Sequence, residues 1–304
     1  MVVIIGKATE EISLHYNLIK GEVEVALSSI IGSIIANLLL LFGLSMIAGG
    51  MKYKEQQIGT QAAQSNITLL GIILPYLTIP SIIPFSPLFD SSITQQIANS
   101  ITLEISLCFS ILILITYGLS LYFSLKTHKS IFLPEGEMLA EKPQWSLLTS
   151  IVILLISTIA VALSSHMFVE SIEETHRILG WSKFFIGGIV AAIVGNAAEG
   201  AVAIWVAREN KISLSFQLAI SSCTQVGLLV APLLIVTSFL IGKPLALQFN
   251  IFEIVALFSS FIIAFAALVD GKTNWFKGIA FIITYFMIAL LYFFHPRKFS
   301  VVNQ

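Results

Sequence analysis

Residues 195–229 of the chain, GNAAEGAVAIWVARENKISLSFQLAISSCTQVGLL, align without a gap on residues 6–40, GKATEEISLHYNLIKGEVEVALSSIIGSIIANLLL. Identical residues, 189 positions apart in every case, are Gly6 and Gly195, Ala8 and Ala197, Glu10 and Glu199, Ile31 and Ile220, Ser33 and Ser222, Leu39 and Leu228, and Leu40 and Leu229. Apolar identities arise easily in an apolar chain, but a shared Gly-x-Ala-x-Glu with a serine 23 residues after the glutamate does not. The chain therefore contains an internal repeat.

The composition is that of a protein whose solvent is a lipid bilayer. Of the 304 residues, 57% are apolar and only 11% are charged, with a mean hydropathy of +0.93, whereas soluble domains carry about 25% charged residues. The net charge of −1 provides no basic field for nucleic acid. Cys108 and Cys223 stand alone in separate apolar runs, so we expect small core side chains rather than a disulfide or a zinc site.

Long apolar stretches predict an all-α polytopic membrane protein. A helix needs about 20 apolar residues to cross a hydrocarbon core of about 30 Å. Stretches of that length occupy residues 24–50, 62–84, 99–125, 146–169, 181–207, 213–241, 249–269 and 274–294. Residues 1–20 form a shorter piece with Lys7, Glu10 and Glu11, which is too polar to span by itself.

The longest polar break, residues 126–144, divides the chain into two halves. We expect an incomplete amino-terminal repeat at 1–125, with a partial span and three full spans, and a complete five-span repeat at 145–296. Residues 126–144 are then a cytoplasmic linker, and residues 297–304 are a short tail.

The distribution of Lys and Arg between the loops sets the expected orientation. The loops at 51–61, 126–144, 208–212 and 271–277 carry nine of these residues, and the opposite loops with the carboxyl terminus carry six. We therefore place the first set in the cytoplasm. Five spans separate equivalent points of the two copies, so the copies cross the membrane in opposite directions. Inverted repeats with a substrate site at their interface are typical of secondary transporters.

Glu199 is an acidic residue deep inside a predicted span, and Glu10 is its equivalent in the first copy. An intramembrane charge costs about 2.5–3.5 kcal/mol on insertion scales, so such a residue normally has a function. Its neighbours Asn196, Ala197, Ala198 and Gly200 are small and let another helix approach closely. The alternative interpretation is a buried acid that is hydrogen-bonded for packing.

Polar side chains at helical spacing follow in each copy. Ser29, Ser33 and Asn37 lie four residues apart, and Ser222 and Gln225 belong to the corresponding polar run, residues 221–225. Hydroxyl and amide oxygens around two carboxylates suit a hard cation with six to eight oxygen ligands. Protons compete for the same oxygens, since metal binding requires deprotonated ligands. Polar contacts between membrane helices are the alternative.

Other polar residues support weaker hypotheses. A cation vestibule or, more simply, a solvated helix end is expected at His166, Glu170, Glu173, Glu174 and His176. A cation-sensing patch or, more simply, a solvated linker is expected at Glu135, Glu137 and Glu141. Glu104 and Glu253 lie close enough to span ends to reach toward the interface. The spans contain no HExxH, paired aspartates or Ser/His arrangement, so we predict no enzyme.

The two polar runs resemble the signatures of the calcium/proton exchanger (CAX) family of the calcium:cation antiporter superfamily. Residues 195–199 with residues 221–225 resemble the second signature, and residues 32–40 resemble the end of the first. Residues 125–128, 184–187 and 270–275 match flanking stretches. The resemblance covers almost the whole chain and implies eleven spans, one leader and two inverted sets of five. By that count this chain lacks amino-terminal spans.

The resemblance also implies the cation ligands. The two signature glutamates correspond to Glu10 and Glu199, with support from Asn196, Ser33, Ser222 and Gln225. Two positions depart from the family: Lys7 replaces Asn in the first signature, and Gly200 replaces His at the end of the second. A lysine one turn from a ligand would repel a divalent cation.

The function predicted from these observations is antiport of a divalent cation, most simply calcium, against protons, without any cofactor. The expected partners are the lipid bilayer and the transported cation. The alternatives are a transport-inactive truncated homologue or membrane subunit, and a sodium-coupled or manganese exchanger. Short loops favour a cell membrane over a vacuolar membrane.

Overall fold

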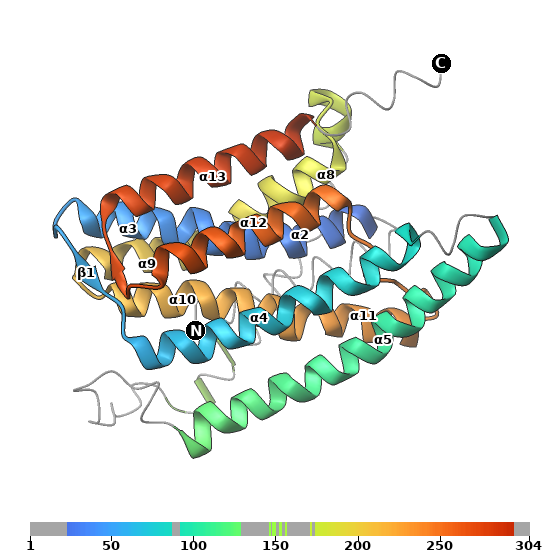
Figure 1. Ribbon diagram of the computed structural model, residues 1–304, viewed down its shortest axis with the longest axis horizontal. Helices are drawn as coiled ribbons and strands as arrows, with labels where there is room; N and C mark the ends of the chain where they lie inside the picture. The colour runs from blue at the N-terminus through green and yellow to red at the C-terminus, as the bar shows by residue number, and fades with distance from the viewer. Residues whose placement is uncertain are drawn as a thin grey trace.

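The computed structural model describes residues 23–86, 92–128 and 174–294, with isolated positions between residues 146 and 171. These ranges are almost entirely helical (Figure 1). The first part contains α2 (Val23–Ile35), η1 (Ala36–Leu41), α3 (Phe42–Gly50), β1 (Gln56–Gln57), α4 (Thr60–Ile82), η2 (Ile83–Phe85), α5 (Ser92–Tyr122) and η4 (Phe123–Thr127). The second part contains α8 (Lys183–Phe185), η5 (Ile186–Ala191), α9 (Ala192–Arg208), α10 (Ile212–Gln225), η6 (Val226–Val230), α11 (Ala231–Leu240), α12 (Ile251–Leu268), β2 (Lys272–Thr273) and α13 (Trp275–Phe294).

Seven helices within the described ranges are long and apolar enough to cross a membrane. They correspond to seven of the eight predicted spans and confirm the polytopic all-α fold. The predicted span at 146–169 falls largely outside the described residues, as do Glu10 and the linker glutamates. The domain boundaries drawn from the sequence stay a prediction.

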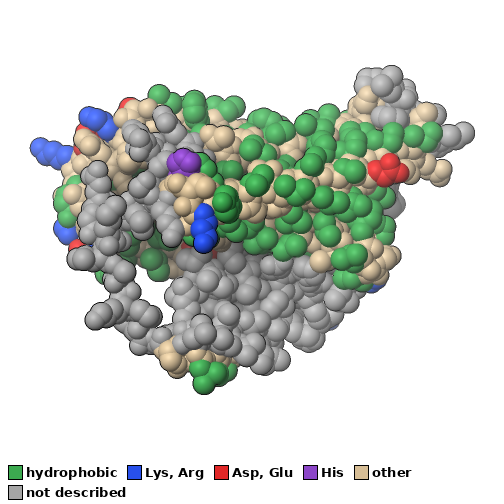
Figure 2. Space-filling view, turned by 90° about the horizontal axis from the view of Figure 1, so that it is seen from below, with side chains coloured by type: hydrophobic (Ala, Val, Ile, Leu, Met, Phe, Trp, Pro, Cys, Tyr) green, Lys and Arg blue, Asp and Glu red, His purple; other side chains and the backbone are tan. Residues whose placement is uncertain are grey.

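On the face shown in Figure 2, most of the described side chains are apolar, and charged side chains gather mainly at one end of the molecule. The span Val23–Gly50 is central, with 83% of its most apolar window buried, whereas Thr94–Thr127 is only 17% buried. Exposed leucine, isoleucine and phenylalanine side chains along α5, α12 and α13 therefore form a surface suited to lipid.

The two sequence repeats form two antiparallel copies of one structural unit. In the first copy α2, η1 and α3 follow one another, and α10, η6 and α11 follow in the second. Val23 and Ile212, which begin the two units, are equivalent in the sequence repeat. The units run in opposite directions (Figure 1). Where they cross, the Cys223 thiol donates to the carbonyl of Ile34, its own equivalent, at 3.4 Å. The inverted-repeat prediction is therefore confirmed.

Both units contain a π-helical segment at the same place, η1 in the first and η6 in the second. A π turn widens the helix locally and is frequent at functional sites. The segment η1 begins three residues after Ser33, and η6 begins four residues after Ser222.

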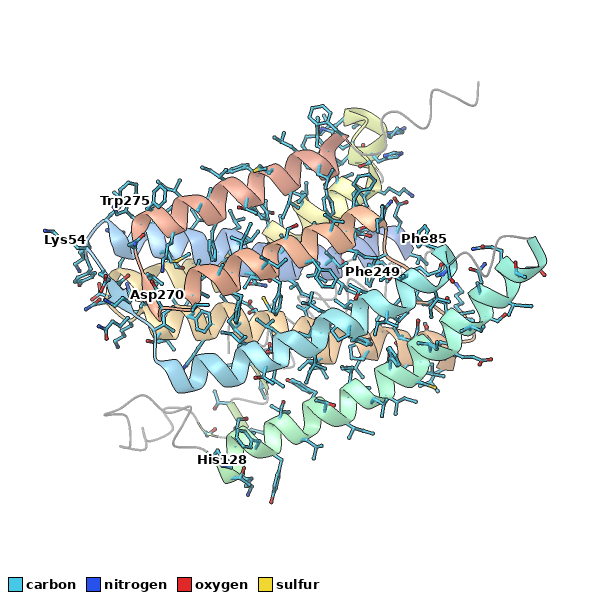
Figure 3. All side chains as sticks on the ribbon, in the orientation of Figure 1. Lys54, Phe85, His128, Phe249, Asp270 and Trp275 are labelled. Carbon is cyan, nitrogen blue, oxygen red and sulfur yellow. The ribbon has the colours of Figure 1, made fainter. Side chains whose placement is uncertain are left out.

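One end of the molecule collects three of the loops that were predicted to share a side. β1 pairs with β2 in antiparallel fashion. The Gln56 side chain donates to the carbonyl of Ala207 and to Asn210, both at 3.0 Å. Lys54, His128, Asp270 and Trp275 lie at this end, and Phe85 and Phe249 lie at the other (Figure 3). These three loops therefore lie on the same side, as predicted, and the assignment of that side to the cytoplasm stays a prediction.

The cysteine prediction is correct for Cys223 and wrong for Cys108. Cys223 is buried between the repeats, whereas Cys108 is exposed on α5. A periodic pattern within an apolar span does not separate the protein-facing side from the lipid-facing side, because both are apolar.

The first repeat packs closely, at a glycine, against the π-helical segment η5 that leads into α9, the helix that carries Glu199. A Cβ atom at Gly32 of α2 would collide with the backbone of Gly188 in η5, including its carbonyl oxygen. Small residues at this crossing allow the backbones to approach closely, as is common between membrane helices.

We expect Gly32→Ala to lower the melting temperature in detergent, since overpacking costs about 1–3 kcal/mol and the obstacle here is backbone rather than a mobile side chain. Gly71→Ala is the matched control, because no atom lies within 4 Å of the added Cβ. Equal melting temperatures for the two variants would contradict the close packing of α2 on η5.

Candidate functional site

Glu199 lies within α9 and is buried, with 4% of its surface exposed. The α9–α10 hairpin places it beside Ser222, whose hydroxyl donates to Glu199 Oε2. Ser222 is also buried, at 1% exposure. The serine 23 residues after the signature glutamate thus contacts that glutamate, which gives the repeated spacing a structural reason.

Asn196 links the two repeats. It lies one turn before Glu199 on α9, and its Nδ2 donates to Ser33 Oγ at 3.0 Å and to the Ala192 carbonyl at 2.8 Å. Its Oδ1 accepts from Asn37 Nδ2 at 2.9 Å and from Ser33 Oγ at 3.3 Å. Ser33 belongs to α2 and Asn37 to η1, so one buried amide bridges the second repeat to the first.

Asn37 is the polar residue that the predicted ligand set omitted. It was part of the polar face of its span, but the family signature did not single it out. The side chain is fully buried, and its Oδ1 atom has no hydrogen-bond partner. An unsatisfied buried carbonyl oxygen is costly, and an oxygen of this kind is a ligand that a hard cation prefers.

The structure brings together four of the six predicted site residues: Ser33, Asn196, Glu199 and Ser222. Gln225 is partly buried at the end of α10, and no described hydrogen bond joins it to this cluster. Within the described ranges, no group of three or more His, Cys, Asp or Glu residues could hold a metal ion. A cation bound here would therefore depend on amide, hydroxyl and carbonyl oxygens as well as Glu199. The role of these residues as cation ligands stays a prediction.

Gly200 makes a close contact with the first repeat. A Cβ atom there would lie 2.5 Å from Cδ2 of Leu41 in η1. The Leu41 side chain therefore occupies the space that a larger residue at position 200 would enter. A glycine at this position thus permits close packing across the repeat interface.

The weaker sequence hypotheses have different outcomes. Glu174 forms an ion pair with Arg177 at 3.7 Å between exposed side chains, as expected of a solvated helix end. Glu104 is exposed on α5. The expectation for Glu253 is wrong: the side chain is 3% exposed and folds back onto the Asn250 N–H in a capping box. At the third helical position the carboxylate accepts a hydrogen bond from the backbone at the start of the helix, so it does not extend toward the membrane interface.

Two antiparallel units that cross at a buried carboxylate define a secondary transporter built from inverted repeats. The family model described as sodium/calcium exchanger protein matches residues 2–126 and 149–294. The chain belongs to this family of cation exchangers.

Two antiporters and one solved structure are similar to this chain over most of its length. The Ca(2+)/H(+) antiporter of Aphanothece halophytica is 35% identical, over 96% of this chain and 80% of its own length. The Ca(2+)/H(+) antiporter ChaA of Bacillus subtilis is 33% identical, over 95% and 80%. The structure of native YfkE superimposes with a TM-score of 0.78 at 32% identity, over 95% of this chain and 81% of that one.

We expect Ser222→Ala to weaken calcium binding about 10-fold, because the change removes a hydroxyl oxygen, of the kind that calcium accepts as a ligand, from beside Glu199. Ser215→Ala is the matched control: Ser215 lies on the same helix and is fully buried, and its hydroxyl has no partner. Equilibrium binding of ⁴⁵Ca²⁺ to the detergent-solubilised chain measures the effect. Equal losses in both variants would remove Ser222 from the site.

Proposed function

We infer that the chain is an antiporter that exchanges Ca²⁺ for protons across a membrane. The observation that carries this inference is the Glu199–Ser222 pair beside Asn196, placed where two inverted repeats cross. The relatives named as Ca(2+)/H(+) antiporters, which this chain matches over most of its length, support the same function.

The exchange follows from competition for the Glu199 oxygens. A calcium ion requires the carboxylate form, so its arrival releases any proton held there, and a proton that binds in turn displaces calcium. Ser222 can serve both states, because its hydroxyl donates to a carboxylate and accepts from a carboxylic acid. The remaining calcium ligands are drawn from buried amide and hydroxyl oxygens such as Asn37 Oδ1 and Ser33 Oγ.

Access from both sides follows from the division of the site between the repeats. Glu199, Asn196 and Ser222 belong to the second repeat, and Ser33 and Asn37 to the first. A movement of one unit relative to the other changes the end of the molecule toward which the site opens, while the ligands stay close together. The hydrogen bonds of Asn196 are the contacts that such a movement must preserve or exchange.

Sodium coupling, manganese transport and an inactive membrane subunit were the alternatives from the sequence. No contact among the described residues favours any of them. We place the exchanger in a cell membrane, because the described loops between its spans are short.

We expect proteoliposomes that contain the chain to take up ⁴⁵Ca²⁺ when a pH gradient is imposed, and we expect Glu199→Gln to abolish the uptake. The glutamine keeps the size of the side chain and can still accept from Ser222, but it cannot carry the charge that calcium requires. Glu104→Gln, which changes an exposed acid, is the matched control and should transport normally.

Replacing the pH gradient with a sodium gradient distinguishes proton coupling from sodium coupling. Uptake driven by sodium alone would contradict proton coupling, and uptake that persists in Glu199→Gln would contradict the site.

A further inference from the structure

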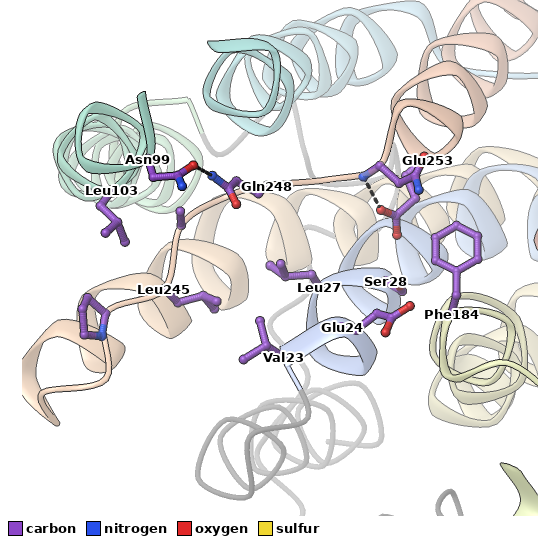
Figure 4. A pocket seen from close by; sticks show the side chains of 13 residues that line it. Val23, Glu24, Leu27, Ser28, Asn99, Leu103, Phe184, Leu245, Gln248 and Glu253 are labelled. Atoms are coloured by element: carbon purple, nitrogen blue, oxygen red, sulfur yellow. Dashed lines mark hydrogen bonds between the residues drawn. The ribbon is translucent and has the colours of Figure 1, made fainter. Parts of the chain in front are cut away.

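A cavity of about 670 Å³ (Figure 4) is lined by Gln248 and Asn250, which flank Phe249 at the end of the molecule opposite β1 and β2 (Figure 3). It is bounded by the start of α2, the start of α12 and the segment between α11 and α12, with α5 alongside. The Glu199 cluster does not line it. Polar side chains in its wall are Glu24, Ser28, Asn99, Gln248, Asn250 and Glu253.

Glu253 lines this cavity, and one oxygen of its buried carboxylate lacks a hydrogen bond of standard geometry. Its Oε2 accepts from the Asn250 N–H at 2.8 Å, which caps α12. Its Oε1 is buried and makes no hydrogen bond of standard geometry, and the Ser28 side chain is the other hydrogen-bonding group beside this carboxylate. Burying such an oxygen without a partner is costly, so capping alone does not account for an acid at this position.

Glu24 and Ser28 approach the same space from α2. Glu24 is exposed, Ser28 is buried, and both side chains lie on the side of α2 that faces Glu253 (Figure 4). Within the described ranges, no lysine or arginine forms an ion pair with either carboxylate. The described part of the wall therefore holds two acids and no lysine or arginine.

One helix, α2, contributes residues both to the cavity and to the central cluster. Ser28 and Ser33 both lie on α2, five residues apart. At about 1.5 Å per residue, they are separated by about 7.5 Å along the axis. Ser28 and Ser33 lie on different sides of α2, about 140° apart around its axis, so the cavity and the Glu199 cluster are close along one helix without sharing a continuous polar face.

We propose that this cavity is a second cation site, in which Glu24 and Glu253 hold a partly hydrated divalent cation on its way to or from Glu199. The proposal rests on calcium transport as the function of the chain. Calcium accepts carboxylate, hydroxyl, amide and water oxygens in flexible geometry, and the cavity has room for the ion with water. Two acids in the wall of a cavity also raise the local cation concentration and the rate of capture.

The direct test is equilibrium binding of ⁴⁵Ca²⁺ to the full chain in detergent, in a Glu199→Gln background that removes the central site. This protein should retain a weaker class of calcium sites. Adding Glu253→Gln should abolish it, and adding Glu24→Gln should weaken it about 10-fold. Glutamine at position 253 can still cap α12, and position 24 is exposed, so neither change should unfold the protein.

Glu104→Gln in the same background is the matched control. Glu104 is an exposed acid on α5, next to Leu103 of the cavity wall but outside the lining. Residual binding that survives Glu104→Gln and disappears with Glu253→Gln supports the second site. The absence of residual binding in Glu199→Gln, or equal binding with and without Glu253, overturns it.

Transport gives an independent readout in the chain with Glu199 intact. Glu253→Gln should raise the KM for calcium about 3- to 10-fold through slower capture and leave the maximal rate unchanged. An unchanged KM contradicts the second site while leaving the exchanger function intact. Loss of gradient-driven uptake in the unmodified chain would instead contradict the proposed function, which the binding assay does not measure.

Discussion

Asn196 forms four hydrogen bonds inside a membrane-spanning bundle, and two of its partners, Ser33 and Asn37, belong to the other repeat. Polar groups in the bilayer must find partners within the protein because no water is available to them. That constraint ties α9 to α2 and η1 and fixes the level at which the two units cross. Glu199 lies one turn further along α9, so the same contacts also place the carboxylate.

The other contacts of the interface follow from this crossing. The backbones of α2 and η5 approach closely at Gly32 and Gly188, and Leu41 fills the space beside Gly200. The thiol of Cys223 reaches the carbonyl of its own equivalent, Ile34, as expected near a twofold relation between units. The interface is thus closely packed at these glycines and polar at the level of Asn196.

Much of this arrangement could be predicted from the sequence. The constant offset of 189 residues located both units, and the serine 23 residues after Glu199 proved to be its hydrogen-bond partner. The sequence could not assign Asn37 to the cluster, because the polar face of its helix offers several candidate ligands and only the packing of the helices selects among them. It also misjudged Glu253 and Cys108. A capping contact depends on where the helix begins, and the lipid-facing side of an apolar span resembles its buried side.

Competition between calcium and protons for Glu199 is the central claim, and the most direct measurement is calcium affinity as a function of pH. The purified chain and Glu199→Gln would be titrated with ⁴⁵Ca²⁺ in detergent from neutral pH into mild acid. We predict that the affinity of the unmodified chain falls as the proton concentration rises, and that the high-affinity site is absent from the variant at every pH. A calcium affinity independent of pH, or the same dependence in both proteins, would contradict the account.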